Sequence, residues 1–163
     1  MKLLRRSETE VVFHLGKREH DAFCKLVDRY PMVPADFSPL SRFADAEDIG
    51  GDQKLLEESL AESKVEGKKA LQAMLNDGKH FHEVSRGWNL HLTPGEVDWL
   101  LQVFGDIRVG CWMKLGCPDE MKGKMPDLTQ DNIEYYVAMD MCGRLQMLLL
   151  HSLRPTDSDE SSL

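Results

Sequence analysis

The sequence predicts an α+β fold that is mainly α, with three to four helices around a central helix at residues 94–115 and a small antiparallel sheet of short strands. Two observations predict this class. Apolar residues recur at helical spacing over much of the chain, and two short stretches alternate apolar and polar residues as half-buried strands do. We expect residues 1–153 to form one globular domain and residues 154–163 to be a disordered acidic tail.

Composition narrows the classes of function. The 163 residues carry 28 acidic and 20 basic side chains, a net charge of −8, and an acidic surface repels the phosphates of nucleic acid. No stretch reaches the roughly 20 apolar residues of a membrane span, and the first residues lack the apolar core of a secretory signal. We therefore expect a cytoplasmic protein that binds neither nucleic acid nor membrane. Reduced thiols are expected at the four scattered cysteines, Cys24, Cys111, Cys117 and Cys142.

The first third of the chain predicts a hairpin, a helix and an irregular segment. Residues 3–15 give two short apolar runs around a polar turn, and residues 17–30 have the spacing of a helix that stops before Pro31. Residues 31–51 are rich in proline and acidic residues and are expected to be irregular. The apolar residues expected to pack this segment back on the domain are Phe37, Leu40 and Phe43.

A long charged helix is predicted from about Asp52 to Leu75. Its middle has little to bury and contains Gly67, so the sequence leaves open whether the helix is continuous there. A strand pair follows at residues 80–92, with a turn near Arg86 and Gly87. The positions expected to mark the buried side of the long helix are Leu56, Leu60, Leu71 and Met74.

The clearest local signal is the start of the central helix. Thr93 is suited to accept from the first helical amides, Pro94 suits the first helical position, and Glu96 is placed to accept from the Thr93 amide, which together form a capping box. Gly116 and Pro118 end this helix. The apolar stripe of the helix consists of Val97, Leu100, Leu101, Phe104, Ile107, Cys111 and Leu115, widened by Trp99, Val103 and Trp112.

A loop at 117–128 and a final helix at 129–153 complete the predicted fold. Met121 and Met125 lie in the loop beside lysines and are expected to stay exposed, a property of surfaces that accept other chains, whereas Met141 is expected in the core. The face of the final helix expected to be buried carries Ile133, Val137, Met141, Leu145 and Leu148.

One short pattern occurs twice. The stretch VFHLGKREHDAFC at 12–24 aligns with NLHLTPGEVDWLL at 89–101, and in each His-Leu precedes a short turn and a helix with a glutamate in its first turn. A strand that feeds a capped helix needs this order of residues, because the glutamate suits the positive end of the helix dipole. Local physics explains the repetition, and a true internal duplication is the alternative.

The histidines are the candidates for a metal site. His80 and His82 point to the same side of a strand, and His14 and His91 fall on the polar phase of theirs. If the strands pair suitably, three or four imidazoles converge and provide zinc ligands. The alternative is a set of surface histidines on a solvated sheet, since no cysteine or carboxylate at ligand spacing supports a metal. We predict no resident cofactor or metal.

No short catalytic motif is present. Cys111 and Cys142 lie in apolar helix stripes, where a buried thiol is inert, and Cys117 has no identifiable base. The sequence contains no GxSxG, no phosphate-binding glycine loop and no paired-aspartate motif of a two-metal site. Asp140 and Arg144, four apart, suit a helix-stabilising surface pair or a polar anchor. We therefore assign no catalytic residue and consider an enzyme the less favoured class.

The stretch DIRVGCWMKLG at 106–116 resembles a bacterial family catalogued as domain of unknown function two thousand and seventeen. The similarity extends over residues 3–150 through the order of the elements, including a helix introduced by Leu-Thr-Pro. This sequence departs from the family pattern at Gly105, Trp112 and Lys114. The positions that match it are Asp106, Ile107, Arg108, Leu115, Gly116, Asp140, Leu145 and Gln146.

The resemblance supplies no activity, but it implies a link to an adaptor of the Clp protease. Together with the amphipathic, methionine-rich helices, it favours a non-catalytic protein-interaction or regulatory protein, adaptor-like in role, with a protein partner and a possible homodimer. The alternatives are a metal-dependent enzyme with a histidine site on the small sheet, and a purely structural self-associating protein. The residues expected to serve structure or interaction are Asp106, Arg108, Trp112, Asp140 and Arg144.

Arg108 and Asp106 lie two apart on the central helix, so they face different sides and each needs a partner elsewhere. We expect Arg108 to be buried and paired with a carboxylate of the 31–51 segment or of the final helix. In that case its removal destabilises the fold by roughly 3–5 kcal/mol, because an unpaired charge stays buried.

Overall fold

The structure is a computed structural model that describes residues 1–36 and 50–154. It confirms the predicted class: within those residues the fold is α+β, mainly α, with four helices and a small four-stranded antiparallel sheet. None of the helices in this part of the chain combines the length and apolar character needed to cross a bilayer. The predicted tail beyond Arg154 and the residues Phe37, Leu40 and Phe43 lie outside the described residues. In chain order the elements are β1 (Lys2–Arg6), β2 (Val11–Gly16), α1 (Lys17–Val27), α2 (Gly50–Asn76), β3 (Phe81–Val84), β4 (Gly87–Leu92), α3 (Pro94–Lys114), a 3-10 turn η2 (Glu120–Lys122) and α4 (Ile133–Leu153).

The sheet has the order β1-β2-β4-β3, so two hairpins meet side by side at its centre. In the central β2–β4 ladder, Phe13 pairs with Leu90. These two residues are also equivalent in the repeated sequence pattern, so the repetition corresponds to an approximate two-fold axis through this pair. Each hairpin leads directly into a helix, β2 into α1 and β4 into α3. The repeated pattern is therefore a repeated strand–helix unit, as predicted.

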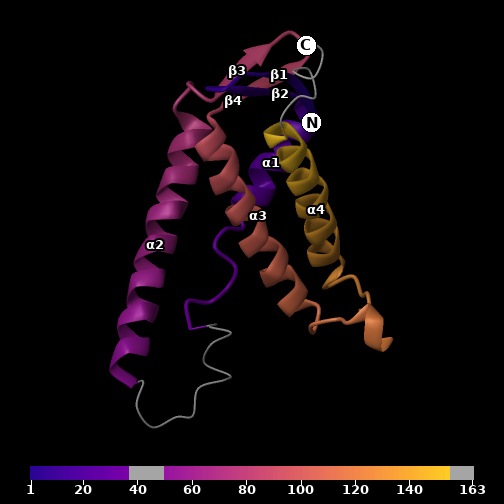
Figure 1. Ribbon diagram of the computed structural model, residues 1–163. Coiled ribbons are helices and arrows are strands. Elements are labelled where there is room, and N and C mark those ends of the chain that lie inside the picture. The colour runs from indigo at the N-terminus through magenta and orange to yellow at the C-terminus, as the bar shows by residue number, and fades with distance from the viewer. Residues whose placement is uncertain (37–49, 155–163) are drawn as a thin grey trace, which may run out of the picture.

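The two faces of the sheet differ because side chains alternate along a strand. Phe13, Leu15 and Leu90 face inward and are buried in the core. The intervening residues, among them His14 and His91, face outward. In Figure 1 the helices lie on one side of the sheet, which caps the end of the helical layer. The outer face therefore carries polar side chains.

Helix α3 is central, as predicted. Thr93 Oγ1 accepts from the Glu96 amide at 3.2 Å, and the Thr93 amide donates to Glu96 Oε2 at 2.8 Å, which confirms the capping box. Its most extensive packing partner is α4, which runs alongside it in Figure 1. The buried residues of α3 are Val97, Leu100, Val103, Phe104, Ile107, Gly110 and Cys111.

The predicted buried face of α4 is wrong in part. Ile133 and Val137 are about half exposed, whereas Met141, Leu145 and Leu148 are partly buried and pack against the core as expected. The side that packs into the core is rotated and carries Tyr135, Ala138, Cys142, Leu145, Leu149 and Ser152. The periodicity failed because α4 is apolar on two sides, and its spacing alone does not tell which side meets α3.

Helix α2 is continuous over 27 residues, Gly67 included. Only its C-terminal part enters the core, through Leu71 and Met74. The prediction that Leu56 and Leu60 are buried is wrong, since their exposures are 47% and 38%. In Figure 1 the N-terminal half of α2 diverges from α3, which leaves these leucines without a core partner among the described residues.

A polar contact compensates for the small apolar area that α2 buries against the core. Asp106 on α3 accepts hydrogen bonds from the Met32 amide at 2.6 Å and the Val33 amide at 3.2 Å, and its second oxygen lies 3.0 Å from Lys64 Nζ of α2. Lys64 also donates to the Val33 carbonyl. The Asp106 side chain is only 13% exposed. One carboxylate thus joins α3, α2 and the segment that follows α1.

Two glycines permit this close approach. A Cβ on Gly110, one turn after Asp106, would lie 2.3 Å from Met32 Cβ. A Cβ on Gly67 of α2 would lie 3.0 Å from the Tyr30 hydroxyl. The segment after α1 is therefore wedged between α2 and α3, and a larger residue at position 110 would push it out.

The expectation that Arg108 is a buried clamp is wrong. Arg108 is exposed, and its hydrogen-bond partner is Gln146 Oε1 of α4 at 3.4 Å. No carboxylate pairs with it in residues 1–36 and 50–154. Asp106 and Arg108 flank opposite edges of the buried stripe of α3, so the segment after α1 meets Asp106, and Arg108 lies at the edge that faces α4.

Asp106→Ala is expected to lower the free energy of unfolding by about 2–3 kcal/mol, because two amides and a lysine lose a charged acceptor in a mostly buried position. Urea titration followed by circular dichroism measures this. Arg108→Met, two residues away, serves as the matched control and should change stability by well under about 1 kcal/mol. Equal effects of the two variants would contradict the role given to Asp106.

Candidate functional site

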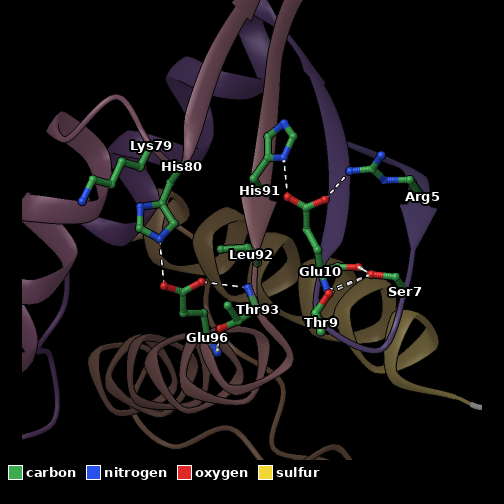
Figure 2. A pocket seen from close by; sticks show the side chains of 10 residues that line it. All are labelled: Arg5, Ser7, Thr9, Glu10, Lys79, His80, His91, Leu92, Thr93 and Glu96. Atoms are coloured by element: carbon green, nitrogen blue, oxygen red, sulfur yellow. Dashed lines mark hydrogen bonds and ion pairs between the residues drawn. The ribbon is translucent and has the colours of Figure 1, made fainter.

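A polar hollow of the described surface lies at one corner of the sheet (Figure 2). It is open to solvent and has a volume of about 690 Å³. One wall is the end of β1 and the β1–β2 turn, with Arg5, Ser7 and Glu10, and the other is the region where β3 begins and β4 passes into α3. Two histidines, His80 and His91, lie in it, each against a carboxylate.

His80 is held on both ring nitrogens. Its Nδ1 lies 2.8 Å from Asp77 Oδ2, and its Nε2 lies 2.8 Å from Glu96 Oε1. Glu96 also caps α3 through the Thr93 amide, as Figure 2 shows. An imidazole that donates from both nitrogens is protonated, so His80 is an ionic bridge between the end of α2 and the start of α3.

The charges of this bridge stabilise one another. Partial burial alone would lower the pKa of His80, but the hydrogen bonds to Glu96 and Asp77 outweigh it and raise the pKa above 6.5. Burial likewise opposes ionisation of Asp77, whose pKa is nevertheless lowered by the amides of Lys79 and His80 and by the His80 ring. The bridge is therefore fully charged in mildly acidic solution.

His91 is oriented differently. Its Nδ1 lies 2.9 Å from Glu10 Oε1, and Arg5 pairs with the other oxygen of Glu10. The hydrogen bond from His91, followed by that from Arg5, holds the pKa of Glu10 below its usual value. The remaining nitrogen, Nε2, points away from Glu10 in Figure 2 and has no partner among the described residues. Such an imidazole can accept a proton or a metal ion.

The hollow lacks the rest of a catalytic set within the described residues. Ser7 Oγ accepts from the Glu10 amide at 3.0 Å and donates to the Glu10 carbonyl at 3.1 Å, so it belongs to the turn and is not activated by a histidine. Glu96 and His80 bind each other. A single oriented imidazole can carry a proton but has no nucleophile beside it.

The structure places three of the four histidines proposed for a metal on one face of the sheet and brings two of them, His82 and His91, into contact. His14, His82 and His91 lie on the outer face of the sheet, and the rings of His82 and His91 are 4.4 Å apart between centroids. His14 Nδ1 lies 3.2 Å from Asn89 Oδ1. His80 turns away from this face toward α3. No group of three or more histidine, cysteine or acidic side chains in the described part of the chain is arranged to hold a metal ion.

The other predicted residues have structural positions. Asp140 and Arg144 form the predicted surface pair at 2.9 Å, and both are more than half exposed. Trp112 is half-buried, and its Nε1 donates to the Pro118 carbonyl at 2.9 Å, which fixes the loop after α3. Burial raises the pKa of the Cys111 thiol, and that of Cys142 to about 12, as expected for unreactive core thiols.

A second hollow, which the sequence did not indicate, lies between α3 and α4; we call it the α3/α4 groove. Its volume is about 560 Å³. Val109 and Tyr136, both about 40% exposed, lie in it beside Arg108, and the exposed side chains of Met121 and Met125 lie in the loop whose Pro118 and Pro126 line it. Residue spacing does not predict this groove, because a groove between helices depends on how the helices cross. The residues that line it are Gly105, Arg108, Val109, Trp112, Pro118, Pro126, Tyr136, Met139 and Gln146.

The partners in the polar hollow were also missed. Asp77 lies three residues before His80 in an Asp-Gly turn, and that spacing is a local signal that could have identified it. Glu10 has no such signal, because it is 81 residues from His91 and reaches it only through the β2–β4 pairing.

Comparison with known proteins adds no relative: no family model, no curated protein and no solved structure matches this chain. The assignment of a role therefore depends on the geometry.

The His80 bridge predicts a pH dependence of stability. Because the folded-state pKa of His80 lies above its ordinary value of 6.5, its contribution is fully present below pH 6.5 and is lost as pH rises through the folded-state pKa. We expect the difference in unfolding free energy between the wild type and His80→Gln to be largest just below pH 6.5 and to shrink in alkaline solution. Urea titrations across this range measure it, and a difference that grows with pH would contradict the bridge.

Proposed function

We propose that this protein is a non-catalytic interaction or regulatory protein of the bacterial cytoplasm, adaptor-like in role. The observation that carries the proposal is the α3/α4 groove, where apolar side chains and an exposed arginine lie together on the surface. Arg108 approaches Gln146 at 3.4 Å and has no carboxylate partner among residues 1–36 and 50–154. The link to Clp proteolysis remains a proposal from the family resemblance.

The groove defines the chemistry of the partner. Val109, Tyr136 and Met139 offer apolar contact, and contiguous exposed apolar surface is typical of protein-binding sites. Arg108 offers a planar donor that suits a carboxylate. A segment of a partner protein with apolar side chains and one aspartate or glutamate toward Arg108 fits both features.

The loop beside the groove supports this assignment. Met121 is 96% exposed and Met125 66%, in agreement with the expectation for these residues. Methionine side chains adapt to different partner surfaces at little cost in conformation. The loop is fixed to α3 at one end by Trp112, and Pro118 and Pro126 of the same loop line the groove.

A photo-crosslinking amino acid placed at Val109 is expected to give discrete adducts with a partner protein in the source cell. The same amino acid at Val65, an exposed valine of α2, is the matched control and should give none of these adducts. Arg108→Glu should remove the Val109 adducts while the fold is retained, because the carboxylate of the partner then meets a like charge. Identical adducts from positions 109 and 65 would refute a groove-specific partner.

A metal-dependent enzyme with a histidine site on the sheet is the second candidate. Three contacts favour it: His91 is oriented by Glu10, His14 lies beside Asn89, and the His82 and His91 rings lie 4.4 Å apart. Orientation of a histidine through its other nitrogen is typical of metal ligands. Metal analysis of protein purified without a histidine tag tests it, with His82→Ala/His91→Ala as the variant. On the leading proposal we expect no stoichiometric metal; near-stoichiometric zinc that the variant loses would establish the second candidate.

A further inference from the structure

The side of α4 that faces solvent has the spacing of a coiled-coil seam. The positions 133, 137, 140, 144, 147 and 151 alternate steps of four and three residues, and all six side chains are exposed. The opposite side of the helix packs into the core through Ala138, Cys142 and Leu149. Helix α4 therefore has two seams, of which the described residues cover one. We call the exposed one the outer seam.

The residues of the outer seam are arranged symmetrically about its centre. Asp140 and Arg144 form the middle, Val137 and Met147 flank them, and Ile133 and His151 are at the ends. Exposures of 50% for Val137 and 74% for Met147 leave substantial apolar area on both sides of the charges. A helix with this order is complementary to an antiparallel copy of itself.

We propose that the outer seam binds a second copy of this chain, so that two α4 helices pack antiparallel around a two-fold axis that passes between the helices at the level of residue 142. Each Asp140 then faces Arg144 of the other copy, and each Val137 faces Met147. An interface of this kind is isologous and closes at two subunits. The proposal is independent of the α3/α4 groove, because none of the outer-seam residues lines that groove.

Charge selects both the orientation and the register. A parallel pair would place Asp140 against Asp140 and Arg144 against Arg144, and like charges at a seam oppose association. A shift of one turn in the antiparallel pair would place Val137 against a charged residue. Arg144 and Asp140 are bonded within one chain at 2.9 Å, so dimerisation shares an existing ion pair and leaves no charge unpartnered.

The size of the seam predicts a reversible dimer. A helix of 21 residues is about 31 Å long, which limits the area that one antiparallel pair covers. Such an interface falls toward the small end of the range for specific complexes. We therefore expect monomer and dimer to exchange, with the dimer favoured as concentration rises.

Sedimentation of the full chain over a series of concentrations tests the proposal. The wild type should pass from monomer to dimer, and Val137→Glu should remain monomeric. D140R alone or R144D alone should raise the dimer dissociation constant about tenfold, because two symmetry-related pairs change from attraction to repulsion. Val65→Glu, on an exposed part of α2, is the matched control and should dimerise like the wild type.

Mixing the two single variants separates the contact between chains from the pair within one helix. In an equimolar mixture of D140R and R144D, each helix keeps like charges four residues apart, yet the two helices complement each other. The mixture should recover wild-type association as a heterodimer, and circular dichroism of each variant should show an unchanged fold. A wild type that stays monomeric, oligomers larger than two, or a mixture as weak as its components would each overturn the proposal.

Discussion

The carboxylate of Asp106 is the interaction on which the arrangement of the helices depends. Helix α2 places only Leu71 and Met74 among the fully buried residues, too little apolar area to fix 27 residues against the domain. Asp106 supplies the missing constraint, since it accepts from the Met32 and Val33 amides and from Lys64 of α2. A buried acceptor with three charge-assisted hydrogen bonds has little freedom to move. The glycine one turn later allows the segment to approach α3, so one helical turn holds both the polar anchor and the space for it.

The near-symmetry of the sheet explains where polar side chains gather. Because the Phe13–Leu90 pair lies at the centre, both hairpins send their helices to the same side, and every second residue of β2 and β4 must face outward. His14 and His91, which occupy equivalent positions in the two hairpins, therefore both lie on the outer face of the sheet. Each half of the chain also has the order hairpin, helix, helix: β1, β2, α1 and α2 in the first half, and β3, β4, α3 and α4 in the second. This shared order agrees with duplication. The same order follows from strand–helix grammar, so the two explanations of the repeated pattern both remain consistent with the fold.

The sequence predicted those parts of the fold that depend on neighbouring residues. Alternation gave the strands, and the Thr93–Glu96 box gave the start of α3, because both signals act within a few residues. Prediction from the sequence failed where two sides of one helix have similar polarity. Arg108 and Asp106 are equally polar, and only the position of the segment after α1 decides which of them is enclosed. Leu60 has the spacing of a core residue, but it lies in the N-terminal half of α2, which diverges from α3. The Glu10–His91 contact needed the strand pairing and could not be predicted from spacing.

The apolar residues on both sides of α4 set the balance between folding and association. The buried side of α4 already packs the helix against α3, so the outer seam is not needed to fold the chain. Exposed apolar side chains such as Val137 and Met147 lower the solubility of a surface that binds no partner. The charged pair at the centre limits that liability, because it lowers the apolar character of the middle of the seam and penalises any partner without complementary charges. Affinity then comes from the apolar ends and specificity from the centre. The α3/α4 groove is lined by other residues of α4, namely Tyr136, Met139 and Gln146, so the two proposed surfaces can be tested by separate substitutions.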